Sequence, residues 1–106
     1  MYIKDAAEAT LQLANAPLEQ IQMMNYLIDG LNPSVAELVD AVRERIPEAQ
    51  ISYHLDEGVQ GMLARTLRPF DGKYAREEWD WKPTYDLGRT IDDFSTDLSQ
   101  HPERFA

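Results

Sequence analysis

The stretch AREEWDWKPTYDL, residues 75–87, constrains the fold of this chain more than any other. Its first residues favour the end of a short helix. Asp80 follows where a helix exit needs a left-handed backbone, which aspartate tolerates better than most non-glycine residues. Pro83 prevents simple continuation of the helix, and Asp86 can cap a new helix over 87–99. The stretch therefore predicts a helix, a tight exit and a second helix.

Two more helices are predicted upstream. Asp5 followed by Glu8 has the spacing of a capping box, so we expect a helix from there to about Ala16, with alanines that allow close packing against a neighbour. Ser34 and Glu37 form a second capping box. The apolar residues that follow recur at helical spacing and predict one buried face, made of Val35, Leu38, Val39, Val42 and Ile46.

Two short apolar runs predict strands. Residues 25–30 (NYLIDG) close with a glycine, and residues 51–55 (ISYHL) alternate with a period of two. A strand, a helix and a strand with short links make a βαβ unit, whose strands are parallel. Residues 56–70 are predicted to be a loop or an irregular helix. The predicted fold class is α+β: a small α/β domain over residues 1–106 in which a βαβ unit with a short parallel sheet is covered by several helices.

The charge of the chain limits the kinds of partner that it can bind. The net charge is −9, which opposes binding to nucleic acid or to an anionic membrane. Residues 65–89 differ, with five acidic and six basic side chains, so an anionic ligand is expected there. The absence of cysteine excludes disulfides and thiolate metal sites, and no metal site is predicted. No apolar run approaches the ~20 residues that span a bilayer, so we expect a cytoplasmic protein.

The stretch around Trp81 resembles the A-R-x-x-L-G-W-x-P-x-x-x-L signature near the C-terminus of extended short-chain dehydrogenases. These NAD-dependent epimerase/dehydratase enzymes include sugar-nucleotide epimerases and L-threonine dehydrogenases. Three further segments are similar to the family in the same order: YLIDG at 26–30, the helix from Ser34, and R-P-x-D at 68–71. The resemblance implies the C-terminal substrate-binding lobe of a Rossmann-type enzyme that acts as an oxidoreductase or isomerase.

The resemblance also implies what such a lobe lacks. The chain contains no G-x-x-G-x-x-G turn for the pyrophosphate of NAD(P), and none of its tyrosines has a lysine four residues later. We therefore expect the chain to bind no cofactor and to be inactive alone. Its implied partners are an N-terminal Rossmann domain that holds NAD(P) and a small anionic substrate. Either the chain is a piece of a longer enzyme, or Met1 starts a free-standing domain.

Arg65 and Arg68 are the predicted substrate-binding residues. The resemblance places them in the loop from which sugar-nucleotide members of the family use an arginine to hold a diphosphate, and a guanidinium group matches phosphate or carboxylate oxygens well. In the alternative, both arginines pair with Glu57, Asp71 or other acids. Members similar to L-threonine dehydrogenase carry a tryptophan in this loop, where this chain has Thr66 or a neighbour; the difference favours a nucleotide sugar or another hydroxylated substrate.

Two alternatives concern the apolar residues. Trp79 and Trp81 either form a stacking surface for a sugar or base or, as we prefer, pack the last helices onto the sheet. A rival function is a stand-alone acidic protein-interaction domain that binds through the first helix and Leu18, Ile21, Met23 and Met24. Either function predicts an exposed apolar surface that promotes oligomerisation.

Overall fold

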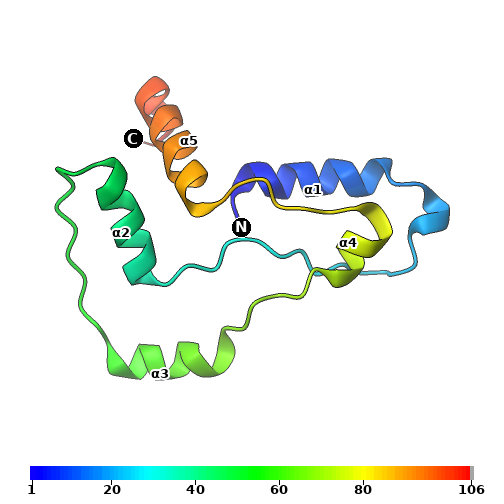
Figure 1. Ribbon diagram of the computed structural model, residues 1–106, viewed down its shortest axis with the longest axis horizontal. Coiled ribbons are helices and arrows are strands. Elements are labelled where there is room, and N and C mark those ends of the chain that lie inside the picture. The colour runs from blue at the N-terminus through cyan, green and yellow to red at the C-terminus, as the bar shows by residue number, and fades with distance from the viewer. Residues whose placement is uncertain (106) are drawn as a thin grey trace.

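The computed structural model describes residues 1–105 as an open arrangement of helices joined by extended segments (Figure 1). Two 3₁₀ turns lie between or after the helices, η1 (Leu18–Gln20) and η2 (Pro102–Arg104). The helices are α1 (Ile3–Asn15), α2 (Val35–Arg45), α3 (Glu57–Thr66), α4 (Lys73–Trp79) and α5 (Leu87–Gln100).

The helix exit and restart around residues 75–87 are confirmed. α4 ends at Trp79, and Asp80 takes the left-handed conformation, with φ 57° and ψ 33°. The Trp81 N–H then donates to the Ala75 carbonyl at 3.1 Å, so the chain folds back over the end of α4. The Asp86 carboxylate caps α5 by accepting from the Arg89 N–H at 2.7 Å.

Of the two capping boxes predicted from the sequence, one is present in the structure and the other is not. The box at Ser34 is confirmed, because its hydroxyl accepts from the Glu37 N–H and the Glu37 carboxylate accepts from the Ser34 N–H. The box at Asp5 is wrong: α1 begins at Ile3, and Asp5 lies inside its first turn. Residues 57–66, predicted as a loop or an irregular helix, form the regular helix α3 behind an Asp56 cap.

The predicted α+β class is wrong, because residues 1–105 contain no β-strand and the lobe is all-helical. Residues 25–30 and 51–55 are extended, as their sequences indicated, but no ladder of backbone hydrogen bonds joins them. A strand needs a neighbouring strand within ~5 Å. Here the second segment leaves α2 toward α3 instead of returning beside the first (Figure 1). The βαβ unit is therefore not formed.

The core is small and lies between α1 and α4. Four side chains form it, Ala9, Ala75, Trp79 and Trp81, with Leu13, Tyr26 and Ile28 partly buried against them. Alanine at position 9 lets α1 approach the two indole rings, whose centroids are 6.0 Å apart. The tryptophans are core residues, as preferred from the sequence, but the prediction that they pack the last helices onto a sheet is wrong, because residues 1–105 contain no strand and the two rings join α4 to α1. A second contact joins α2 to α5, where Val39 and Ile91 are buried.

The lobe is expanded for its length. Its radius of gyration is 17.1 Å, whereas a compact domain of this length has about 13 Å. Its accessible surface is 8356 Å², against about 6,000 Å² for a compact monomer of this mass. Large apolar side chains such as Ile3, Leu18 and Met24 remain exposed. The fold therefore leaves much apolar surface uncovered.

Candidate functional site

Asp5 is the most buried charged side chain in the described residues, 2% exposed. One carboxylate oxygen accepts from the Thr84 N–H at 3.0 Å and from the Thr84 hydroxyl at 2.8 Å. The other accepts from the Tyr85 N–H at 3.2 Å. Asp5 thus ties the start of α1 to the segment between α4 and α5 and fixes where α5 begins.

Asp93 makes the neighbouring link from α5 back to the N-terminus. Its carboxylate accepts from the Tyr2 hydroxyl at 2.5 Å and from the Lys4 ammonium at 2.8 Å. The hydrogen bond from Lys4, followed by that from Tyr2, lowers the pKa of Asp93. The same hydrogen bond to Asp93 raises the pKa of Tyr2 to about 12. The two anchors hold α1 and α5 in a fixed relation.

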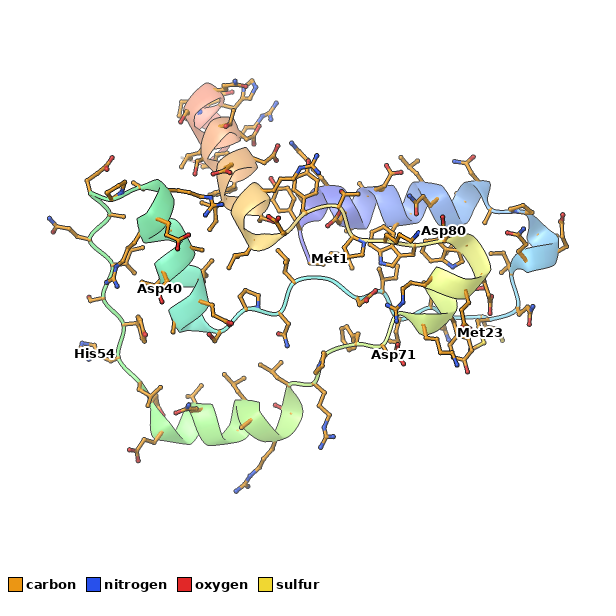
Figure 2. All side chains as sticks on the ribbon, viewed as in Figure 1. Met1, Met23, Asp40, His54, Asp71 and Asp80 are labelled. Atoms are coloured by element: carbon orange, nitrogen blue, oxygen red, sulfur yellow. The ribbon has the colours of Figure 1, made fainter. Side chains whose placement is uncertain are left out.

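Arg76 joins three segments around the N-terminal end of α4. Its guanidinium donates to Asp29 at 2.5 Å and to Asp71 at 3.1 Å. Gly72 lies beneath this pair and is buried, because a β-carbon there would overlap the Asp29 carboxylate. Figure 2 shows Asp71 beside the start of α4. The cluster positions the segment that follows Arg68.

Arg65 and Arg68 are the basic side chains that remain free. Of the ten lysines and arginines, these two alone form neither a hydrogen bond nor an ion pair within residues 1–105. Asp71, one of the expected acidic partners, is engaged with Arg76 instead. Both arginines are exposed. Two guanidinium groups are thus available to bind an anion near the end of α3.

The structure does not place the two arginines in one cavity. Arg65 lies in the last turn of α3 beside a shallow groove, with Glu57, Gly58, Gly61 and Met62. Arg68 lies in the segment after α3, beside a pocket of ≈ 380 Å³. Its neighbours in this pocket include Ile28, Gly30, Leu31, Pro69 and Phe70. A single ligand would have to bridge the two positions.

One concave surface was not foreseen from the sequence. An apolar groove of ≈ 700 Å³ runs between α2 and α5, and Tyr2, Ile51 and Tyr53 line it together with the apolar faces of both helices. The helical spacing after Ser34 indicated one side of this groove, and the alternation of Ile51 and Tyr53 indicated another. Their meeting depends on the packing of α2 against α5, which local pattern does not encode.

The described residues do not fit a dinucleotide. The five glycines are scattered, and none within residues 1–105 has a positive φ or forms a glycine-rich turn between a strand and a helix. At the N-terminal end of α4, where a phosphate would bind in such a turn, Asp71 accepts from the Lys73 N–H. A carboxylate there repels phosphate. Nor do residues 1–105 contain a cluster of three side chains that could hold a metal ion.

Comparison with known proteins decides the family. No protein-family model matches the chain. It is 37% identical over 91 residues to the mitochondrial L-threonine 3-dehydrogenase of Sus scrofa, covering 86% of this chain and 24% of that protein. It is 27% identical over 88 residues to an uncharacterized epimerase/dehydratase of Staphylococcus aureus, covering 82% of this chain and 27% of that protein.

The chain belongs to the extended short-chain dehydrogenase/reductase superfamily. It corresponds to a C-terminal part of these enzymes and spans about a quarter of the length of the curated relatives that it matches.

Solved structures of the superfamily share the fold. A GalE-like L-threonine dehydrogenase from Cupriavidus necator superposes with a TM-score of 0.79 at 32% identity, over 92% of this chain and 35% of that protein. A partial consensus L-threonine 3-dehydrogenase superposes with a TM-score of 0.80 at 31% identity. The open arrangement of helices is thus similar to one third of larger enzymes. Within residues 1–105 each helix is too short or too polar to span a bilayer.

Proposed function

We propose that the chain is the substrate-binding lobe of an NAD(P)-dependent oxidoreductase, in which a Rossmann domain supplies the cofactor and the catalytic residues. The free guanidinium groups of Arg65 and Arg68 are the main support for this proposal. The other lysines and arginines of this acidic lobe have partners, whereas these two side chains remain available to a ligand. In the proposed enzyme they bind the anionic group of the substrate. The lobe alone binds no cofactor and is inactive.

L-threonine is the first substrate to test. The relatives named L-threonine 3-dehydrogenase are more similar to this chain than the epimerase/dehydratase relatives are, at 37% against 27% identity. A guanidinium group can bind a carboxylate as well as a diphosphate. The two arginines could therefore bind either the carboxylate of an amino acid or the diphosphate of a nucleotide sugar. The nucleotide sugar, the isomerase reaction and the cytoplasmic location predicted from the sequence stay predictions.

A chimera tests the proposal. This chain replaces the corresponding third of the Cupriavidus necator enzyme, and NADH formation is followed with L-threonine. We expect turnover, and we expect Arg65→Gln and Arg68→Gln each to raise KM about ten-fold, the loss of one charge-assisted hydrogen bond. Lys82→Gln is the matched control, because that exposed lysine pairs only with Asp80 and should change KM little. A folded chimera whose KM is unchanged by both arginine substitutions would contradict the assignment of Arg65 and Arg68 as substrate-binding residues.

The rival function, a stand-alone acidic interaction domain, rests on the exposed apolar side chains. It predicts that an unrelated protein binds this surface, whereas the proposed function predicts that a Rossmann domain covers it. A chimera that binds NAD and turns over substrate would favour the proposed function, since turnover requires the lobe to pack against the Rossmann domain in the arrangement of an active enzyme.

A further inference from the structure

The extended segment at residues 25–31 crosses the lobe between η1 and α2 without a backbone partner (Figure 1). Within residues 1–105 its N–H groups donate no hydrogen bond. One of its carbonyl groups is an acceptor, that of Asp29, which accepts from the Trp81 indole N–H at 3.4 Å. Nearly all main-chain groups that become buried in folded proteins are paired. The segment therefore either stays in water or is paired by something outside the lobe.

The side chains of this segment are covered on one face only. Tyr26 and Ile28 pack against the core around Trp79, and the Tyr26 hydroxyl donates to Glu78. Leu27 belongs to the opposite face of an extended chain and is 58% exposed. A continuous apolar run of this kind is typical of strands that a parallel sheet buries on both faces. Here only one of the two faces is buried.

Trp81 indicates which edge of the segment is open. In an extended chain the N–H and C=O of one residue point to the same edge, and those of the next residue point to the opposite edge. Because the Asp29 carbonyl accepts from the Trp81 indole, that edge faces the lobe itself. The main-chain groups of Tyr26, Ile28 and Gly30 belong to the other edge, where no backbone hydrogen bond forms within residues 1–105.

The edge of a Rossmann sheet fits this segment. Such a sheet is mostly parallel and open, so its last strand presents unpaired main-chain groups. The match covers 35% of the Cupriavidus necator enzyme, which leaves the larger part of such an enzyme as a partner. A second copy of this chain fits less well, because two-fold symmetry would give an antiparallel two-stranded ribbon, which is marginal alone. Each copy also carries a charge of −9, which opposes association.

We propose that residues 26–30 add as an edge strand to the sheet of the Rossmann domain, through the main-chain groups of Tyr26, Ile28 and Gly30. This inference rests on the proposed function, because it takes a Rossmann domain as the partner. It adds that backbone pairing joins the lobe to that domain and sets their relative orientation, and that Leu27 becomes buried on the sheet. The lobe thus supplies a strand to a sheet that it does not form alone.

Hydrogen exchange of the full 106-residue chain and of the chimera with the Cupriavidus necator enzyme tests the pairing. We expect the amides of residues 26–30 to exchange freely in the isolated chain. In the chimera, those of Tyr26, Ile28 and Gly30 should slow about 100-fold or more, and the two between them much less. Free exchange in a folded chimera, or protection without alternation, would overturn the strand. Protection already present in the isolated chain would overturn it without a chimera.

Leu27→Ala and Ile28→Ala provide an independent arm. Ile28 packs against the core of the lobe, so Ile28→Ala should lower the Tm of the isolated chain and of the chimera. Leu27 is exposed in the isolated chain, so Leu27→Ala should shift that Tm by less than about 3 °C. In the chimera it should lower the Tm as much as Ile28→Ala does. A chimera whose Tm is unchanged by Leu27→Ala would overturn the inference.

NADH formation from L-threonine by the chimera distinguishes failure of the strand from failure of the proposed function. Turnover with freely exchanging amides at 26–30 would overturn the strand and support the substrate-binding lobe. A folded but inactive chimera with alternating protection would support the strand and count against the proposed function.

Discussion

At the scale of single residues, Asp5 stabilises a long-range contact that its position in the sequence does not indicate. The spacing of Asp5 and Glu8 is that of a capping box, yet the carboxylate serves residues 84 and 85 instead. The sequence pattern could not reveal this, because the two partners are far apart along the chain. Asp86 shows the opposite case, since its partner lies three residues away and the local pattern was sufficient.

Asp5→Ala should therefore destabilise the lobe by about 3 kcal/mol, because it leaves the N–H groups of Thr84 and Tyr85 without their charged acceptor. Urea unfolding followed by tryptophan fluorescence measures this, since both tryptophans lie in the core. Glu8→Ala, on the exposed side of the same helix, is the control and should change the free energy of unfolding by less than about 0.5 kcal/mol. Equal effects of the two substitutions would refute the anchor.

Gly72→Ala and Gly61→Ala should have opposite effects. A β-carbon at Gly72 overlaps the Asp29 carboxylate that pairs with Arg76, and this crowding should cost about 1–3 kcal/mol. A β-carbon at Gly61 meets open space in a helix and should stabilise by up to about 1 kcal/mol. Thermal unfolding of the pair checks the sign of each change. A neutral Gly72→Ala would mean that the cluster around Arg76 is loose.

Asp93 gives the lobe a dependence on pH. Hydrogen bonds from Lys4 and Tyr2 lower its pKa below the ordinary value of 3.8. A lowered pKa in the folded state means that the contribution of Asp93 is present above the ordinary value and is lost as the pH falls through the folded value. The free energy of unfolding should thus decrease as the pH is lowered below about 4. Asp93→Asn should flatten that part of the plot of unfolding free energy against pH. An unchanged profile in the variant would assign the acid sensitivity to other groups.

At the scale of elements, the helices were more predictable than the strands. Helix ends depend on nearby residues, and Ser34, Asp80 and Asp86 acted as their sequence context indicated. The extended segments at 25–30 and 51–55 were also recognised, but pairing requires a partner strand that periodicity cannot identify. Arg65 and Arg68 were selected as a site from the sequence, whereas only the structure showed that acids do not neutralise them.

The capping box of α2 offers a test at this scale. Ser34→Ala removes the hydroxyl that accepts from the Glu37 N–H at 3.2 Å, and the loss of such a cap costs about 1 kcal/mol. Because α2 packs against α5, we expect faster hydrogen exchange in the first turn of α2 and near Ile91. Ser99→Ala, at the exposed end of α5, is the comparison. Exchange that accelerates in the first turn of α2 but not near Ile91 would contradict the packing of α2 against α5.

At the scale of the whole molecule, the lobe is incomplete as a folding unit. A radius of gyration of 17.1 Å and a surface of 8356 Å² exceed those of a compact monomer, and the groove between α2 and α5 is almost entirely apolar. Apolar surface on this scale marks a contact region. A chain that matches a third of larger enzymes at a TM-score of 0.79 has a clear candidate for what covers that surface, the rest of such an enzyme.

The most direct test of this account is the binding of a hydrophobic dye to the isolated chain and to the chimera with the Cupriavidus necator enzyme. We predict strong dye fluorescence and self-association for the isolated chain, and for the chimera only the weak signal of a closed enzyme. An isolated chain that is a compact monomer and binds no dye would contradict the account, because the lobe would then be complete without a Rossmann domain.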